Sequence, residues 1–238
     1  MTEFTTWRSL VDGAEISAIP DSEGEHQYNF ENDELTTIPD EIGTEDLAFE
    51  SLNWQTGAGV GDVYVLFGGD TSATFSDDEV FDFLLDQNGT IGVWVKPTSS
   101  DEFDGIIGTD IGTDETRHFA VGVGGTDEWR VCCNIDGDTR TTGGNRQNDE
   151  WQFLAMVVEK GEEVRGYEAI PGTGYDVNNY GSTGISSDSA SSWRRTPTYG
   201  EAGRDGWDGG GDLCFIDSEP LSESELQRWV DDTKRFYE

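Results

Sequence analysis

Residues 89–97, GTIGVWVKP, decide the fold class of this 238-residue chain. Successive side chains of an extended strand point to opposite faces, so Ile91, Val93 and Val95 share one face while Trp94 and Lys96 lie on the other. The stretch ends at a proline, which cannot donate to a sheet ladder and marks an edge or a turn. This pattern predicts one strand of a sandwich of two antiparallel sheets.

Short apolar stretches bounded by turn residues recur on both sides of this strand, as is typical of a sandwich. They are HQYNFE, AFESLNW (48–54), VYVLFGG (63–69), GIIGTDI, RHFAVGVGG (117–125), WRVCCNI (129–135), a hairpin over 150–170 that turns at 160–162, and DLCFI (212–216). Residues 171–211 are rich in Gly, Ser, Asn and Tyr and are predicted to be mostly loop. The sequence therefore predicts an all-β, jelly-roll-type architecture.

One helix is predicted near the end of the sequence, within LSESELQRWVDD. Ser222 is an N-cap residue type, and Glu225 follows at the capping-box spacing. Leu226, Trp229 and Val230 then fall on one helical face. At the other end, residues 1–24 are polar with isolated apolar positions. We interpret them as an N-terminal arm or short helix that precedes a single domain over 25–238.

The charge of the chain is strongly negative. It carries 50 acidic and 14 basic residues, a formal net charge of −36, and the acids are spread over the whole length. Self-repulsion of this size destabilises a compact state, and molar salt screens it. The composition therefore predicts a halophilic source, the alternative being an acidic protein from an ordinary environment. A nucleic-acid partner is disfavoured, because no basic patch is present to replace counterions.

The terminal sequence and the cysteines bear on location. Neither a secretion signal nor an apolar stretch of about 18 residues is present, so neither export by that route nor membrane insertion is predicted. The three cysteines give no disulfide framework. Cys132 and Cys133 are expected to point to opposite faces of a strand as small buried hydrophobes.

Several longer segments occur in a characteristic order. They are YNFENDELTTIPDEIGTEDL, WQTGAGVGDVYVLFGGDTSATF, GTIGVWVKPTSS, DEWQFLAMVVEKGEEVRGYEAI and GDLCFIDSEPLSESELQRW. This order resembles that of the concanavalin A-like, laminin-G-like (LamG) jelly rolls over about residues 26–234. The resemblance implies two sheets packed face to face, one of them curved with a concave outer surface. It does not imply one function, because the fold hosts lectins, glycanases, adhesion modules and viral surface proteins.

Catalysis is not predicted. Glu102 and Asp104 lie two apart, as a carboxylate pair on one strand face would, but the family pattern expects a further glutamate where Ile106, Ile107 and Gly108 stand. Close acidic pairs also arise by chance in so acidic a chain. The sequence therefore predicts a protein that is not an enzyme, with a glycoside hydrolase or lyase on the same fold as the alternative.

Two groups of loop residues are candidates for binding. Tyr180, Trp193, Tyr199 and Trp207 lie in polar loops, where exposed rings could stack on sugars; the alternative is that they anchor the loops or form subunit contacts. The second group, Asp205, Asp208 and Asp212, surrounds flexible glycines and is a candidate calcium site, since hard cations prefer clustered oxygen ligands. The alternative for these acids is a solvated loop.

The expected function is that of a non-catalytic, lectin-like binding or structural module. A surface module without a secretion signal has one simple route outwards, as part of a virus particle released by lysis. We therefore expect a virion surface component of a halophilic archaeal virus, such as a capsid decoration, a turret or a tail-associated adhesin for host attachment. Its expected partners are other virion structural proteins, further copies of itself as a homo-oligomer, and cell-surface glycans. The alternative is a cytoplasmic scaffold protein of a halophile.

Overall fold

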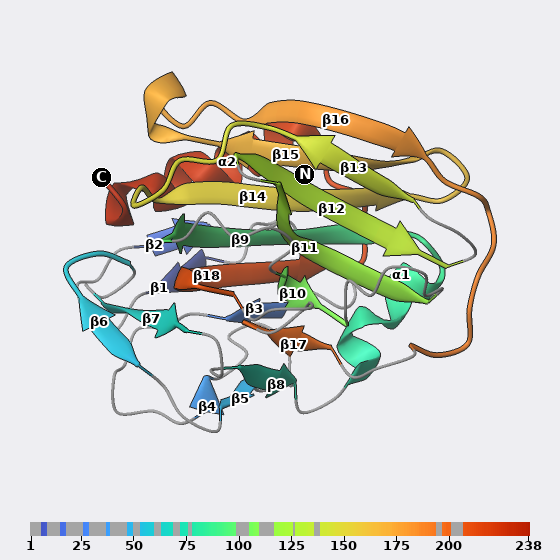
Figure 1. The fold of residues 1–238 in the computed structure, drawn as a ribbon, viewed down its shortest axis with the longest axis horizontal. Coiled ribbons are helices and arrows are strands. Elements are labelled where there is room, and N and C mark those ends of the chain that lie inside the picture. The colour runs from blue at the N-terminus through green and yellow to red at the C-terminus, as the bar shows by residue number, and fades with distance from the viewer. Residues whose placement is uncertain are drawn as a thin grey trace.

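The computed structural model describes residues 6–8, 15–17, 26–28, 37–38, 47–49, 53–59, 63–68, 72–75, 78–98, 105–109, 117–125, 127–135, 139–193, 197–200 and 207–238. In these parts of the chain two antiparallel sheets pack face to face, and a C-terminal helix lies outside one of them (Figure 1). The prediction of an all-β, two-sheet jelly-roll sandwich with a C-terminal helix is confirmed.

The two sheets are named here by their strand order. Sheet I has the order β13 (Arg140–Gly143), β12 (Glu128–Asn134), β11 (His118–Gly125), β10 (Gly105–Gly108), β17 (Thr198–Tyr199), β8 (Ala73–Phe75), β5 (Leu47–Phe49), β4 (Thr37–Ile38). Sheet II has the order β16 (Asn178–Gly184), β15 (Glu163–Ala169), β14 (Gln152–Glu159), β9 (Gly89–Pro97), β18 (Gly209–Asp217), β7 (Val63–Phe67), β6 (Trp54–Thr56). A further strand, β3 (His26–Tyr28), pairs with β18 beyond the part that pairs with β7.

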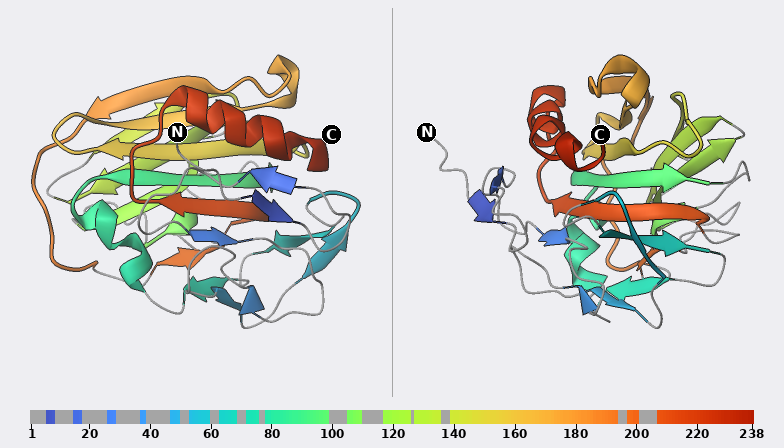
Figure 2. Two further views of the ribbon diagram at one scale, coloured as in Figure 1. Left: turned by 180° about the vertical axis from the view of Figure 1, so that it is seen from behind. Right: turned by 90° about the vertical axis from the view of Figure 1, so that its left-hand side faces the viewer.

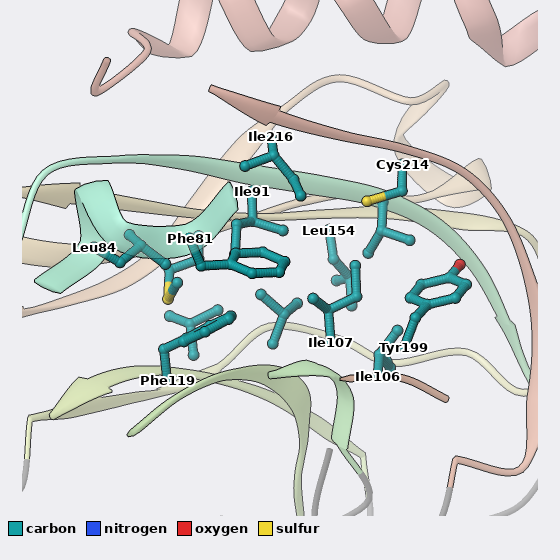
Figure 3. Packing of buried hydrophobic residues seen from close by; sticks show 14 of the residues in the cluster. Phe81, Leu84, Ile91, Ile106, Ile107, Phe119, Leu154, Tyr199, Cys214 and Ile216 are labelled. Atoms are coloured by element: carbon teal, nitrogen blue, oxygen red, sulfur yellow. The ribbon is translucent and has the colours of Figure 1, made fainter. Parts of the chain in front are cut away.

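Strand β9 lies at the centre of sheet II, between β14 and β18, over the residues that the sequence pattern predicted. Ile91, Val93 and Val95 are buried in the core between the sheets, where Figure 3 shows Ile91 among side chains from both sheets. Trp94 is also fully buried, but on the opposite face of the strand. The alternation of the sequence thus corresponds to two separate cores, one on each side of sheet II.

The second core lies between sheet II and helix α2 (Glu223–Thr233), which runs across the outer face of that sheet (Figure 2). The predicted capping box is present: the Ser222 backbone N–H donates to Glu225 Oε2 at 2.8 Å, and the Glu225 backbone N–H donates to Ser222 Oγ at 3.4 Å. The Trp229 ring packs on Phe153 and Phe215, with centroid distances of 5.1 and 4.7 Å. The helix continues into a 3-10 turn, η4 (Lys234–Phe236).

Three shorter helical segments complete the described elements apart from the N-terminal strands. η2 (Asp78–Phe81) and α1 (Asp82–Leu85) form a connected pair before β9, and η3 (Pro171–Thr173) follows β15. Phe81 and Leu84 from the first two segments enter the inter-sheet core (Figure 3). Among the described residues, no helix combines the length and the apolar character that crossing a membrane requires.

The two sheets are joined along one side by hydrogen bonds from the edge strand β13 of sheet I to β16 and β15 of sheet II. The Thr183 hydroxyl of β16 donates to the Arg140 carbonyl of β13 at 2.8 Å. The Thr141 hydroxyl of β13 donates to the Val164 carbonyl of β15 at 3.2 Å. Strands β13 and β16, the edges of sheet I and sheet II, are thereby held against each other.

One sequence-based expectation about a strand was wrong. Residues 48–54 were predicted as one strand, but β5 and β6 are separate and belong to different sheets. The Gly- and Asn-rich stretch 171–211 was predicted as mostly loop, and its described part also contains the seven-residue strand β16. β16 is an edge strand with exposed positions, so it needs no alternation of apolar side chains and leaves no such signal in the sequence.

The N-terminal residues 1–24 were interpreted as an arm or short helix. The described parts of this stretch are strands: β1 (Thr6–Arg8) pairs with β2 (Glu15–Ser17) in an antiparallel ribbon, which lies beside α2 (Figure 2). The prediction of a helix is therefore wrong for residues 6–8 and 15–17. The division into an arm over 1–24 and a domain over 25–238 stays a prediction.

Candidate functional site

The four aromatic residues proposed as a ligand surface are not exposed. Trp193 is 8% exposed, while Tyr199 and Trp207 are each 1% exposed. Tyr180 is half-buried and packs against the inter-sheet core. The expectation that these rings form an exposed stacking surface is wrong, because each ring packs within the sandwich.

The contacts of Trp193 and Tyr199 support the alternative role, in which the rings anchor connecting segments. The Trp193 ring lies edge-on to Phe119, with centroids 4.9 Å apart. The Tyr199 ring lies edge-on to Phe67 at 5.0 Å, and its hydroxyl donates to the Asp212 carbonyl at 3.2 Å. Figure 3 shows Tyr199 inside the sandwich.

Trp207 and Tyr180 each cover a glycine. A Cβ added to Gly209 would lie 2.6 Å from the Trp207 ring, so the ring occupies the space above the backbone of β18. A Cβ added to Gly166 would overlap the Tyr180 ring in the same way on β15. Glycine in a strand commonly marks such a close approach.

The proposed calcium site is not assembled by the described residues. Asp208 is exposed at the start of β18, and its carbonyl accepts the Thr98 backbone N–H at 3.2 Å. Asp212 is fully buried, and Asp205 lies outside the described residues. No group of three or more His, Cys, Asp or Glu side chains that could hold a metal occurs within the described ranges. Calcium binding stays a prediction.

The outer face of sheet I carries a continuous row of residues that have short side chains except at one end. The strand registers align one residue from each of the eight strands: Thr37, Ala48, Thr74, Thr198, Gly108, Ala120, Cys132 and Arg140. This set is called the sheet I row below. Its neighbours along the strands, such as Phe119, Val121 and Cys133, point into the inter-sheet core. Alternation along each strand therefore places the row on the outer face.

The sheet I row changes character along its length. Thr37, Ala48 and Thr74 are exposed and Thr198 is half-buried, so hydroxyl and methyl groups face outwards there. Towards β13 the row becomes buried, with Ala120 at 0% and Cys132 at 1% exposure. The burial of Cys132 on this face and of Cys133 in the core confirms the prediction that the two cysteines point apart.

Polar side chains flank the buried part of the sheet I row. His118 of β11 and Asn134 of β12 are paired in register, and His118 Nε2 lies 2.8 Å from Asn134 Nδ2. The Arg130 guanidinium, on the same face of β12, donates to the Gly124 carbonyl at 3.3 Å. Both flanking groups are buried. The buried part of the row is thus flanked by amide, imidazole and guanidinium groups.

The carboxylates weighed for catalysis, Glu102 and Asp104, lie outside the described residues. A different buried carboxylate stands out in the described part of the chain. Glu168 of β15 is 5% exposed, and its Oε2 accepts the Asn145 backbone N–H at 2.8 Å. Burial raises the pKa of Glu168, and the hydrogen bond from Asn145 opposes this effect in part.

Replacing Glu168 with glutamine is expected to stabilise the protein at neutral pH. A carboxyl whose pKa is raised by folding favours the native state most below its ordinary value of about 4.3, and this contribution is lost as the pH rises through the raised value. Glutamine keeps an acceptor for the Asn145 N–H without the charge. Thermal unfolding over a pH series should show that Glu168→Gln unfolds at a higher temperature than the wild type at pH 7. This difference in unfolding temperature should shrink in acid.

The matched control for this variant is Glu162→Gln, at an exposed position on the turn between β14 and β15. It removes one negative charge from the same acidic surface without touching a buried group. A gain in unfolding temperature for Glu168→Gln that does not change with pH, or that equals the gain for Glu162→Gln, would contradict a raised pKa of Glu168.

A sequence model of one protein family matches this chain. The family is described as the concanavalin A-like lectin/glucanases superfamily, and the match covers residues 67–225. The matched part begins at the end of β7 and reaches the first turn of α2, so it includes strands of both sheets. No curated protein sequence matches the chain.

Several solved structures share the fold. Domain 4 of a GH43 extracellular arabinanase from Geobacillus stearothermophilus, in complex with arabinotriose, matches 86% of this chain and 96% of its own length, with a TM-score of 0.61 and 16% identity. The binding domain of botulinum neurotoxin DC in complex with SialylT matches 89% of this chain and 52% of its own, with a TM-score of 0.62 and 11% identity. Trypanosoma rangeli sialidase in complex with the inhibitor DANA matches 92% of this chain and 34% of its own length, with a TM-score of 0.64 and 11% identity.

Proposed function

Because this chain belongs to the concanavalin A-like lectin/glucanases superfamily, we propose that it is a non-catalytic, lectin-like module that binds glycans on the outer face of sheet I. The observation that carries the proposal is the sheet I row. Its exposed threonines, Thr37 and Thr74, offer hydroxyl groups that can donate and accept hydrogen bonds, and the exposed Ala48 between them adds a methyl group that an apolar sugar face can contact. An extended glycan lying across β4, β5, β8 and β17 would meet one such residue per strand.

Two of the similar structures support a glycan ligand, because each is a complex with a bound ligand, arabinotriose in one and SialylT in the other. The arabinanase domain holds arabinotriose, and its likeness extends over nearly its whole length. The toxin binding domain holds SialylT, although this chain spans only about half of that protein. At 16% and 11% identity these likenesses show the fold alone, so the sugar that this chain binds has to be found by experiment.

Binding without turnover is proposed because of the residues on this face. Glycoside hydrolysis uses two carboxylates, about 5–5.5 Å apart in retaining enzymes and about 6.5–9.5 Å apart in inverting ones. The sheet I row contains no acid in any of its eight positions. Polysaccharide turnover in molar salt that Glu102→Gln abolishes would replace this proposal with the hydrolase alternative.

The test is glycan binding by a variant that blocks the exposed part of the row. Thr74→Trp places a large ring on the floor of the face, whereas Ser182→Trp places the same ring on the exposed edge strand β16 as a control. Labelled protein is applied to immobilised cell-surface glycans in molar salt, with and without a chelator. We expect saturable binding that Thr74→Trp weakens at least about tenfold, or about 1.4 kcal/mol, while Ser182→Trp leaves it unchanged.

The outcomes of this test separate the candidate functions. No binding by folded wild-type protein would overturn the lectin-like proposal and favour the scaffold alternative. Equal binding by both tryptophan variants would move the site away from the sheet I row. Loss of binding in chelator would support the calcium prediction.

We also propose that the module sits on the surface of a virus particle of a halophilic archaeon, with other virion proteins and copies of itself as partners. The support is compositional: a net charge of −36 suits molar salt. Antibody labelling of intact, purified virions tests this location. Detection of the protein only inside host cells would overturn it.

A further inference from the structure

A line of aromatic rings runs along the outer face of sheet II, on the side opposite to the sheet I row. It begins at the half-exposed Tyr64, which lies edge-on to Trp151 with centroids 5.1 Å apart. Trp151 lies 4.9 Å from Tyr237, and Tyr237 is stacked on Trp94 at 4.2 Å, with ring planes 22° apart. The line therefore leads from the surface into a pocket that Tyr237 fills.

Tyr237 is held in this pocket by a polar contact as well as by stacking. Its hydroxyl donates to Asp212 Oδ2 at 2.9 Å, and the Leu213 backbone N–H also bonds to the hydroxyl. Burial, and then the neighbouring Asp212 charge, raise the pKa of Tyr237 well above its ordinary value, so the hydroxyl keeps its proton and donates. Asp212 itself is fully buried, at the irregularity in β18 between Gly211 and Cys214.

The pocket contains polar groups that packing alone does not require. Burial of a carboxylate is costly unless it is hydrogen-bonded, and a well-packed apolar residue at such a site is often no less stable. The indole N–H of Trp151, whose ring centroid lies 4.9 Å from that of Tyr237, is buried and has no acceptor within the described part of the chain. A ring with one hydroxyl, such as tyrosine, satisfies Asp212 but leaves this donor unused.

We propose that the pocket formed by Trp94, Trp151 and Asp212 is a subsite for one pyranose ring, which Tyr237 occupies when no sugar is bound. A pyranose has about the size of a phenol ring, an apolar face that can stack on Trp94, and several hydroxyls. One hydroxyl can replace that of Tyr237 at Asp212, and another oxygen can accept the Trp151 N–H. The site is independent of the sheet I row, because it lies on the outer face of the other sheet.

The attachment of Tyr237 allows it to leave without unfolding α2. The helix is fixed by Leu226, Trp229 and Val230, and its Thr233 hydroxyl accepts the Trp94 indole N–H at 2.9 Å. Beyond Thr233 the chain forms the short turn η4, and the Tyr237 backbone N–H donates to the Lys234 carbonyl of that turn. Outside the turn, the Phe236 carbonyl accepts the Gly59 N–H at 3.0 Å.

The test measures sugar binding by Tyr237 variants in molar salt, with methyl α-glucopyranoside, methyl α-galactopyranoside and methyl α-mannopyranoside as probes. Tyr237→Ala removes the competing ring, so at least one probe should bind about tenfold more tightly than to the wild type, with a change in tryptophan fluorescence. Tyr237→Phe keeps the ring but loses the bond to Asp212, so its affinity for the same sugar should lie between those of the wild type and Tyr237→Ala. Adding Asp212→Asn to Tyr237→Ala should abolish the gain.

Phenol serves as the matched probe, because an emptied apolar cavity binds aromatic molecules without recognising sugars. Binding of phenol but of none of the glycosides by Tyr237→Ala would overturn the proposal and leave the pocket as core packing. If Tyr237→Ala does not fold, the same comparison is made with Tyr237→Phe, where no gain over the wild type overturns it. Failure of the Thr74→Trp test would leave this result unaffected, since the two variants act on opposite faces.

Discussion

Lowering the salt concentration from ~1 M to ~0.01 M is expected to lower the unfolding temperature of this protein steeply, and it is the largest effect that we predict. The chain has 50 acidic residues against 14 basic ones. The Debye length grows from about 3 Å to about 30 Å over this range, so repulsion between carboxylates changes from contact range to the width of the domain. Thermal unfolding followed by circular dichroism across a potassium chloride series measures this fall in unfolding temperature.

Charge neutralisation supplies the control for this prediction. At low salt, acidification towards the ordinary carboxyl pKa values of about 4 should recover part of the lost stability, because it removes the same repulsion without adding ions. A non-ionic osmolyte such as sucrose should not reproduce the steep dependence on ionic strength. An unfolding temperature that stays constant across the salt series would contradict both the expectation and the proposed saline environment.

Trp229→Ala is expected to cost about 3–5 kcal/mol in the free energy of unfolding, the second largest effect. The Trp229 side chain is 2% exposed and fills the space between α2 and two phenylalanines of sheet II, Phe153 and Phe215. Alanine would leave a cavity between the helix and the sheet that rigid strands cannot close. Denaturant unfolding at constant molar salt measures the change.

Two further variants of the same helix define what the Trp229 result means. Trp229→Phe keeps a ring in contact with both phenylalanines and should lose less than the alanine variant. Glu223→Ala, at an exposed position in the first turn, should change stability by no more than about 0.5 kcal/mol. Equal losses for Trp229→Ala and Glu223→Ala would mean that the layer between α2 and sheet II contributes little to folding.

Elements whose signal is local were predictable from the sequence. β9 has apolar side chains at every second position of one face and ends at a proline, and the structure gives it the predicted bounds. The start of α2 follows from Ser222 and Glu225, whose side chains act on backbone groups three residues away. In both cases the residues that specify the structure are neighbours in the chain, so no tertiary information was needed.

The candidate sites depend on relations that a single sequence does not contain. Thr74 and Ala120 belong to one row only because several strand registers align them, and each residue is unremarkable in its own strand. Trp193 and Trp207 lie in stretches of loop composition, which predicted exposure; their burial is decided by core residues distant in the chain, such as Phe119. Tyr237 carries no local signal in the sequence, because its stacking on Trp94 joins positions far apart in the chain.

The hydrogen bonds between β13 and β16 have a consequence for aggregation. Sheet edges invite pairing with other molecules, and proteins commonly discourage this with charge. In molar salt charge repulsion acts only at contact distance, so a protein adapted to such conditions has to protect its edges by structure. Here the Thr183–Arg140 bond joins the edge strands β16 and β13, and the Thr141–Val164 bond joins β13 to β15. At the other ends of the described sheets, β4 and β6 are only two and three residues long. If the protein works in molar salt, as proposed above, its resistance to edge-to-edge association depends on these closed and short edges more than on its surface charge.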